Sequence, residues 1–330
     1  MEGPTGPASA TIRRVAAANP LLSYCIVNTE KRALLARCLE AVAAERNRLA
    51  IPTETIVFDN ASADGSRELA ESHPAVDRVI ASRRRIGKAA CDSTLLEEAR
   101  GEFCLLLNED AELLPGASEA LLEALRADPG AATAGAQLLA PDGRPVPCAW
   151  RFPTPLTALL AALGLADLLV VQSKGSRTRR VDWCQSSALL VRRAAAARIG
   201  YLDKRFFVYS DEVDFAKRLT AAGYHNLYVP AARAIHHEQL SSDPNARRRI
   251  VELSRNRDLY IRLHHGPLAA LAVRLISAFG YLLRAVAALF LPGRSPRRYL
   301  IHVGASLLPG RGEGIRELAE AYNRRLEEGH

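Results

Sequence analysis

The chain has 330 residues, of which 48% are hydrophobic and 24% charged. This composition is that of a folded globular protein and excludes a wholly disordered or fibrous chain, and the length accommodates one large domain or two small ones. Lysine and arginine outnumber aspartate and glutamate by 44 to 36, a formal charge of +8 that favours anionic partners such as nucleotides or acidic lipid headgroups. No recognisable RNA-binding or DNA-binding module accompanies that charge, so nucleic acid is not expected as a partner.

The N-terminal residues and the cysteines indicate the compartment. Residues 1–20 are rich in glycine, proline and alanine and lack the apolar run of a secretory signal, which predicts a flexible tail and a cytoplasmic location. The six cysteines are widely spaced without a CxxC pair. Buried free thiols in a reducing compartment are therefore expected rather than a zinc site.

Up to Gly130, short apolar runs alternate with amphipathic helical patterns. Strands are expected at 21–27, 53–59, 77–82 and 103–108, and helices at 32–46, 64–72, 88–99 and 118–127. This alternation predicts an α/β protein with a parallel sheet that is covered by helices on both faces.

Polar residues stand at the carboxyl ends of three of these expected strands. They are Asn28, Thr29 and Glu30, then Asp59 and Asn60, then Asn108, Glu109 and Asp110. Because parallel sheets bind ligands beyond the carboxyl ends of their strands, these side chains are the first candidates for a site. No GxGxxG or Walker A sequence is present, which argues against a dinucleotide dehydrogenase or a P-loop NTPase.

The pattern changes after Gly130. A proline-rich segment leads into the apolar stretch Leu156–Val171, which is shorter than the roughly 18–20 residues needed to cross a bilayer and is expected to form a buried or interfacial helix. A strand at 186–193, a helix starting within 206–219 and a strand at 225–230 follow. A second apolar helix is expected over Pro267–Pro292, with its arginines on one side. That division favours a helix lying in a membrane interface, and a helix packed on the rest of the protein is the alternative.

Seven short segments follow one another in a recognisable order. They are CIVNT (25–29), DNASADGS (59–66), LLLNEDAEL (105–113), SSALLVRR (186–193), FFVYSDEVDFAKRLTAAGYHNLYVP (206–230), ARAIHH (232–237) and RNRDLYIRLHH (255–265). In this order they resemble the motifs of family 2 glycosyltransferases, in particular the rhamnosyltransferase-like branch. The resemblance implies a GT-A fold, a Rossmann-like mixed and mainly parallel sheet with helices on both faces, followed by a C-terminal helical extension.

The resemblance also implies an organisation along the chain and a donor site. We expect a tail at 1–20, a GT-A domain at 21–265 and a helical, membrane-interfacial region at 266–330. The donor is expected to be a nucleoside diphosphate sugar carrying UDP or dTDP. The expected donor-binding residues are Asn28, Thr29, Glu30, Asp59, Asn60, Arg85, Lys88, Asn108, Arg255 and Arg257.

Two donor segments have alternative interpretations. The carboxylate of Asp59 can accept hydrogen bonds from a nucleobase or a ribose, but DNASADGS also has the composition of a turn or a helix cap. The basic run Arg83–Lys88 stands where the family has an Asn-x-Gly-Phe loop, and its side chains could hold phosphate or be solvated.

The segment 108–110 takes the place of the family's metal segment. Asp110 is therefore the expected ligand of a divalent metal ion, Mg²⁺ or Mn²⁺, which would neutralise the charge of a diphosphate leaving group. Glu109 stands where the family usually has proline. His236 is the expected second metal residue, since the family carries a histidine at this point that reaches the metal or the diphosphate.

The expected catalytic residues are Glu212 and Asp211. They align with the family's Glu-Asp-x-Asp motif, whose second carboxylate takes the proton of the acceptor hydroxyl, but the two acids are exchanged here. Glu212 holds the position of the base and Asp211 is the rival, while acidic residues in a first helical turn also serve the helix dipole. Asp182 and Trp183 resemble the acceptor-side wall, although Trp183 could equally be a core residue.

These residues together lead to one functional expectation and one alternative. We expect an inverting, metal-dependent glycosyltransferase that moves a sugar to a hydroxyl of a glycan or lipid-linked acceptor, in cell-envelope or polysaccharide assembly. Its expected location is cytoplasmic, peripheral on the inner face of the plasma membrane. The exchanged acids and the altered 83–93 loop leave open a catalytically inactive scaffold or sugar-nucleotide-binding protein with the same fold.

Overall fold

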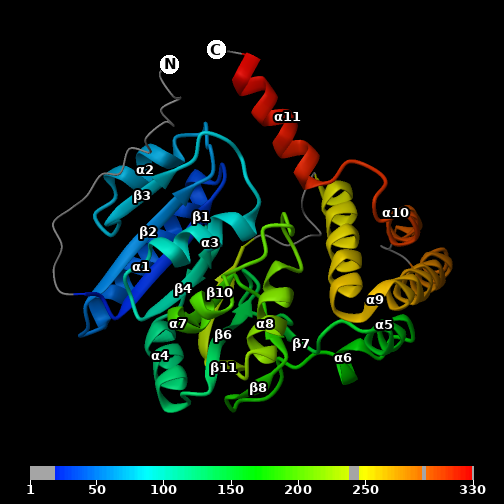
Figure 1. Ribbon diagram of the computed structural model, residues 1–330, viewed down its shortest axis with the longest axis horizontal. Coiled ribbons are helices and arrows are strands. Elements are labelled where there is room, and N and C mark those ends of the chain that lie inside the picture. Colours follow the sequence, from blue (N-terminus) through cyan, green and yellow to red (C-terminus); the bar gives the residue numbers. More distant parts are fainter. Residues whose placement is uncertain (1–18, 238–244, 292–294, 329–330) are drawn as a thin grey trace, which may run out of the picture.

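A computed structural model describes residues 19–237, 245–291 and 295–328 of the chain. Most of the expected N-terminal tail, residues 1–18, lies outside the described residues. In the described part, helices flank a central sheet, and a group of C-terminal helices stands beside this unit (Figure 1). The α/β fold class expected from the sequence is confirmed.

The central sheet is mixed. Its nine described strands follow the order β3-β2-β1-β4-β10-β6-β11-β5, with β8 beside β11. Their bounds are β1 (Leu22–Asn28), β2 (Thr53–Asp59), β3 (Arg78–Ala81), β4 (Phe103–Asn108), β5 (Ala111–Leu113), β6 (Ala131–Leu139), β8 (Arg179–Val181), β10 (Ala188–Arg192) and β11 (His225–His236). The first four strands of this order are parallel, β10 is antiparallel to both its neighbours, and β6 and β11 are parallel. Two short strands, β7 (Ala149–Trp150) and β9 (Trp183–Cys184), pair separately.

The register of the parallel strands brings their polar ends together. Asn28 at the end of β1 lies opposite Asp59 at the end of β2, and Val27 lies opposite Asn108 at the end of β4. The helices between these strands bury apolar side chains against the sheet in one continuous core. They are α1 (Arg32–Arg48), α2 (Ser66–Ser72), α3 (Lys88–Glu98) and α4 (Ala117–Ala127). All six cysteines are buried, as expected.

The strand β6 was not predicted from the sequence. All nine of its residues are buried, but most are alanine or glycine, which are not typical of strands. The reason for small residues is a close approach: a Cβ on Gly135 would lie 2.6 Å from the sulfur of Cys184. A larger residue at this position would therefore separate β6 from the neighbouring chain.

The expected single helix over Leu156–Val171 is divided in two. The helix α5 (Pro155–Ala162) begins with a capping box between Thr154 and Thr157, and α6 (Ala166–Leu169) follows a left-handed Gly164 with φ 78°. Neither helix has a buried residue, so the interpretation of this stretch as a buried helix is wrong.

The C-terminal helices begin inside the expected catalytic domain. The helix α9 (Ala246–Ala287) runs through the expected boundary at 265 and kinks at Gly266, whose φ of 85° and ψ of 172° are not helical. The helix α10 (Pro296–Leu307) packs along α9, and a ring of α10, His302, stacks on Tyr281 of α9 with centroids 4.3 Å apart. The helix α11 (Ile315–Glu328) then returns toward the sheet (Figure 1).

Candidate active site

A cavity of about 690 Å³ lies where the polar ends of the parallel strands meet. It is lined by residues from the strand ends, the 85–88 loop, the start of α8 (Asp211–Ala221), the end of β11 and the helix α11. The expected site residues in its wall are Thr29, Asn60, Arg85, Lys88, Asn108, Asp110, Asp211, Glu212 and His236. Segments far apart in the sequence are thus gathered around one space.

Asn28 and Asp59 lie behind the cavity wall. Both are buried, and the Asn28 Nδ2 donates to the Asp59 Oδ1 at 3.1 Å and to the Ser62 Oγ at 3.1 Å. The backbone N–H of Ser62 donates to the Asp59 Oδ2 at 3.1 Å. In this structure the Asp59 carboxylate therefore holds the turn after β2, and its contact with a nucleotide stays a prediction.

The 85–88 loop is held by the cavity residue Asn60. Its Oδ1 accepts from the Ile86 N–H at 2.8 Å, and its Nδ2 donates to the Ile86 carbonyl at 3.0 Å. Arg85 forms an ion pair with Glu30, which does not itself line the cavity. The loop therefore has a defined shape, although it lacks the family's Asn-x-Gly-Phe sequence.

The helix α11 contacts this loop, and its contribution to the site was not predicted from the sequence. The Asn323 side chain accepts from the Arg85 N–H at 2.7 Å and donates to the Arg85 carbonyl at 2.9 Å. The Tyr322 ring lies under the Arg85 guanidinium at 3.4 Å, and its hydroxyl donates to the Ala61 carbonyl at 3.0 Å. The same face of α11 contributes Leu318 and neighbouring residues to the cavity wall. Its apolar positions follow a helical period, which was the available sequence signal.

Asp110 and His236 face each other across the wall of the cavity. The His236 Nε2 lies 3.3 Å from the Asp110 Oδ1 and 3.2 Å from the Ser187 Oγ. β5 pairs with the end of β11, and this pairing places the two segments side by side. The next histidine, His237, instead contacts Glu112 at 2.8 Å, which distinguishes the two neighbouring histidines.

The acidic pair lies at the start of α8, after two residues in a strained conformation. Tyr209 and Ser210 have φ angles of 69° and 60°, which are rare for residues other than glycine and are typical of functional sites. Asp211 is 1% exposed, and apart from Glu212 its carboxylate oxygens have no hydrogen-bond partner among the described residues. Glu212 is half-buried and reaches the cavity.

Burial raises the pKa of the Glu212 carboxyl well above its usual range, and the adjacent Asp211 carboxylate raises this pKa further because it opposes a second negative charge. Lys88 lies nearby and contacts Asp92 at 2.5 Å and the Ser186 Oγ at 3.2 Å. Burial alone would lower the pKa of Lys88, but Asp92 and Asp211 outweigh it and raise this pKa. Lys88 therefore stays positively charged beside the acidic pair.

A close backbone contact fixes Lys88 at this place. Its backbone N–H donates to the Phe207 carbonyl at 2.6 Å, just before the strained turn into α8. A Cβ on Gly87 would lie 2.7 Å from the same carbonyl oxygen, so glycine is required for this approach.

Besides Asn28, Glu30 and Asp59, four expected site residues do not line the cavity. Asp182 accepts from the Phe152 N–H at 2.7 Å, and Trp183 stacks on Trp150 with ring centroids 4.7 Å apart. Arg255 contacts Glu317 at 2.9 Å, and Arg257 donates to the Ser306 Oγ at 3.3 Å. The structure thus gives each of these four residues a local partner outside the cavity. Their donor and acceptor roles stay predictions.

Comparisons with known proteins identify the family of this chain. The model of a family described as Glycosyl transferase family 2 matches residues 23–146. The N-acetylglucosaminyl-diphospho-decaprenol L-rhamnosyltransferase of Mycobacterium tuberculosis is 30% identical over 215 residues, which cover 58% of this chain and 68% of that protein. Rhamnosyltransferase WbbL of Escherichia coli K12 is 42% identical over 57 residues, which cover 17% of this chain and 22% of WbbL.

Solved structures share the fold at low sequence identity. The mannosyltransferase PcManGT of Pyrobaculum calidifontis, in complex with GDP-Man and Mn²⁺, has a TM-score of 0.54 at 18% identity and covers 94% of this chain and 85% of its own. TarS 1–349 of S. aureus, in complex with UDP-GlcNAc, has a TM-score of 0.50 at 14% identity, with 87% and 81% covered. With the family match and the rhamnosyltransferase relatives, these findings establish that the chain is a glycosyltransferase of the GT-A fold and belongs to glycosyltransferase family 2, in its rhamnosyltransferase-like branch.

Proposed function

We propose that this enzyme transfers a sugar, with inversion, from a nucleoside diphosphate donor to a hydroxyl of a lipid-linked glycan acceptor in cell-envelope assembly. The observation that carries the proposal is the gathering, around one cavity, of a carboxylate and imidazole pair and of a second acidic pair. The printed name of the mycobacterial relative supports a lipid-linked acceptor, and the solved neighbours hold sugar nucleotides.

The pair formed by Asp110 and His236 fits a divalent metal ion. A carboxylate oxygen and an imidazole nitrogen 3.3 Å apart are both ligands that Mn²⁺ accepts in proteins. Among the described residues no group of three or more histidine, cysteine or acidic side chains could hold a metal. Such a two-residue site suits a metal whose remaining ligands are diphosphate oxygens and water. When bound, the ion would neutralise the charge that develops on the leaving diphosphate.

The acidic pair supports a single displacement. In this proposal the acceptor hydroxyl oxygen bonds to the anomeric carbon while the bond from that carbon to the diphosphate breaks. Glu212 takes the proton of the hydroxyl, because of the two acids that line the cavity Glu212 is the more exposed: it is half-buried, whereas Asp211 is 1% exposed. The positive charge of Lys88 compensates part of the negative charge of these two carboxylates.

A ligand screen followed by a transfer assay tests the proposed function. Sugar nucleotides with different bases and sugars are added with Mn²⁺ or Mg²⁺, and the unfolding temperature is measured, since a ligand of the folded state raises it. Donors that stabilise the protein are then assayed for transfer to a polyprenyl-diphosphate-linked sugar. A donor that binds without either hydrolysis or transfer would support the inactive scaffold instead.

Asn323→Ala is expected to weaken donor binding about tenfold with little change in the rate at saturating donor. The substitution removes both hydrogen bonds to the backbone of Arg85, and an unsatisfied buried polar group costs about 1–3 kcal/mol. Titration calorimetry with the donor found in the screen measures the effect. Arg324→Ala, an exposed change at the next residue, is the matched control. Equal donor affinity of the two variants would show that the contact of α11 with the loop does not contribute to donor binding.

We further propose that the protein works on the cytoplasmic face of a membrane, through an exposed apolar face. The second half of α9 is the main part of this face, and its large exposed residues are Leu268, Leu271, Leu275, Phe279, Leu282, Leu283 and Val286. Exposed leucines of α5 and α6 join it, since α5 packs on α9.

The arginines of this segment of α9 point into the protein. Arg274 pairs with Asp258 at 2.7 Å, and Arg284 donates to the carbonyl of Ala161 in α5. Among the described helices α9 is long and apolar enough to cross a membrane. Its kink at Gly266 and the polar contacts on one side favour a helix that lies in the interface.

The double substitution Leu275→Asn and Phe279→Asn is expected to lower the partition of the protein into liposomes tenfold or more. Burial of one large apolar side chain is worth about 1.5–3 kcal/mol, and both residues are more than half exposed in the free protein, at 55% and 57%. Flotation with vesicles of acidic phospholipid measures the loss. Leu263→Asn, ahead of the kink, is the control. Unchanged flotation of the double variant would exclude this face.

A further inference from the structure

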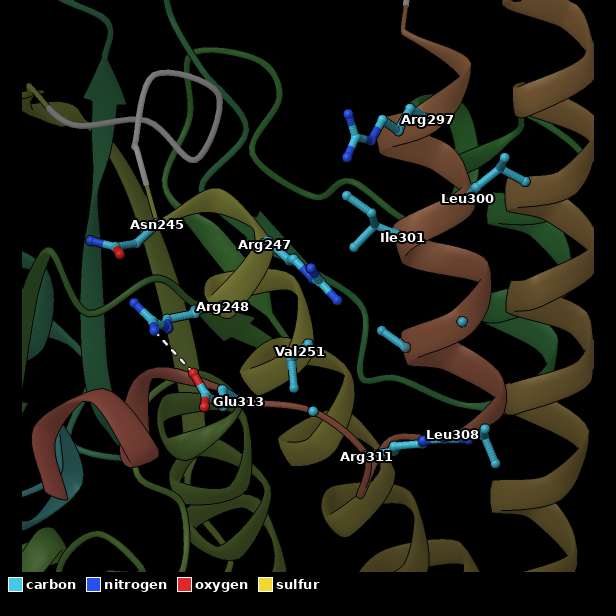
Figure 2. A pocket seen from close by; sticks show the side chains of 13 residues that line it. Asn245, Arg247, Arg248, Val251, Arg297, Leu300, Ile301, Leu308, Arg311 and Glu313 are labelled. Atoms are coloured by element: carbon cyan, nitrogen blue, oxygen red, sulfur yellow. Dashed lines mark hydrogen bonds and ion pairs between the residues drawn. The ribbon is translucent and has the colours of Figure 1, made fainter. Parts of the chain in front are cut away.

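A second cavity, of about 800 Å³, lies between the first turns of α9, the helix α10 and the turn at 308–313 that leads to α11 (Figure 2). Four arginines line it: Arg247 and Arg248 of α9, Arg297 of α10 and Arg311 of the turn. Glu313 is the acidic residue of the lining and pairs with Arg248 at 3.0 Å. The cavity, which we call the arginine groove, therefore has a surplus of positive charge.

Three of these guanidinium groups have no partner that neutralises them. Within the part of the chain that the structure describes, the side chains of Arg247, Arg297 and Arg311 form no hydrogen bond or ion pair. Figure 2 shows Arg247 projecting from α9 toward α10, which carries Arg297. Arg247 and Arg297 carry like charges on two separate helices that face each other, so an anion bound between them would lower the electrostatic energy. Guanidinium groups are especially suited to phosphate oxygens.

The rest of the groove is apolar. Val251 at its wall is buried, and Ile301 projects into the space between α9 and α10 (Figure 2). Leu300 and Leu308 of the same lining are each 52% exposed. A free phosphate would use the arginines but leave this apolar surface in water. A ligand that joins a phosphate group to a hydrocarbon chain would use both.

The arginine groove is adjacent to the catalytic cavity. Arg248 lines the groove and the next residue, Arg249, lines the catalytic cavity. Likewise, Glu313 lines the groove and Ile315 lines the catalytic cavity. On its other side, α10 packs on α9, whose second half carries the exposed apolar face. The groove thus lies between the place where an acceptor sugar must react and the surface proposed to meet the membrane.

We propose that the arginine groove binds the diphosphate of a polyprenyl-diphosphate-linked acceptor. Arg247 and Arg297 would contact the diphosphate oxygens, and the first isoprene units would lie along Ile301 and Leu308. The sugar of the acceptor would then extend toward Glu212. This proposal rests on the proposed function for the acceptor class, and it commits to a lipid diphosphate rather than to free phosphate or an anionic phospholipid surface.

The test uses farnesyl diphosphate as a soluble probe and the full chain. Binding is measured by calorimetry with a chelator present, so that a metal in the catalytic cavity does not hold the diphosphate. The double variant Arg247→Gln, Arg297→Gln is expected to bind the probe about a hundredfold more weakly, or about tenfold for each lost charge-assisted contact. The matched control removes two other exposed arginines, Arg126→Gln and Arg177→Gln.

Further measurements distinguish a lipid diphosphate from other ligands that contain phosphate. Inorganic diphosphate is expected to bind more weakly than farnesyl diphosphate, and Ile301→Ser is expected to reduce that difference. In the transfer assay the double arginine variant should raise the KM for the polyprenyl-linked acceptor more than it lowers kcat.

Each other outcome is decisive. Equal binding of farnesyl diphosphate by the double variant and the control would overturn the proposal. Equal binding of inorganic and farnesyl diphosphate would show a general phosphate site and would overturn the proposal. If the double variant no longer floats with phosphatidylglycerol vesicles but still binds the probe, the arginines contact the membrane, and this result would overturn the proposal too. If probe binding depends on Arg247 and Arg297 while the wild-type protein transfers no sugar, the groove stands and the proposed function fails.

Discussion

Glu212→Gln is expected to lower the rate of sugar transfer by about 10²–10⁴-fold or more, with donor affinity almost unchanged. The amide keeps the size of the side chain but cannot take the proton of the acceptor hydroxyl. Asp211→Asn is expected to be less damaging, because Asp211 is 1% exposed whereas Glu212 is half-buried at the cavity. Transfer rates and donor dissociation constants of both variants are measured together.

The pH dependence provides a second measure of the same pair. Burial, followed by the charge of Asp211, raises the pKa of Glu212, so Glu212 holds its proton to a higher pH than an ordinary glutamate. The base form gains population as pH increases, and the transfer rate should therefore rise through this pKa. Asp211→Asn removes the negative charge that raises the pKa of Glu212, so the acid limb of the rate profile should move to lower pH.

The two acids could have exchanged their roles along with their positions. In that event Asp211→Asn would be the inactive enzyme and Glu212→Gln would remain active. This result would overturn the assignment of the base while leaving the glycosyltransferase family intact.

Asp110→Asn is expected to abolish metal-dependent turnover of the donor without unfolding the protein. The asparagine preserves the shape of the side chain and its place opposite His236, but it loses the negative charge that attracts a divalent cation. Donor hydrolysis and calorimetric Mn²⁺ binding are the measurements, and thermal unfolding reports the fold.

The control for this prediction is Glu109→Gln, which removes one negative charge from the adjacent residue of the same cavity wall. A general electrostatic effect would weaken Mn²⁺ binding equally in both variants. A specific ligand at Asp110 predicts a much larger loss there. Unchanged Mn²⁺ affinity in Asp110→Asn would show that the metal is held elsewhere.

Local sequence patterns were sufficient to predict β1, β2 and β3, which pair with each other in the order in which they occur along the chain. The strand β2 spans the same residues, Thr53–Asp59, that the apolar run predicted, because its residues are β-formers bounded by turn residues. The polar residues at the ends of β1, β2 and β4 were also expected at one edge, since parallel strands align their carboxyl ends. These inferences need only the period and composition of short segments.

The sequence by itself thus determined the α/β class, the family motifs and the identity of the polar residues at the strand ends. Only the tertiary structure showed which segments complete the wall of the site, because this depends on contacts between residues distant in the chain. Asn323 reaches the backbone of Arg85 across 238 positions of sequence, and no local pattern reports such a pair. β6 was missed for the same reason: its alanines and Gly135 contradict strand propensity, and only the approach of Cys184 explains why small side chains are needed there. Packing of this kind outweighs intrinsic propensity because burial in a close-packed interior is decided by the neighbours.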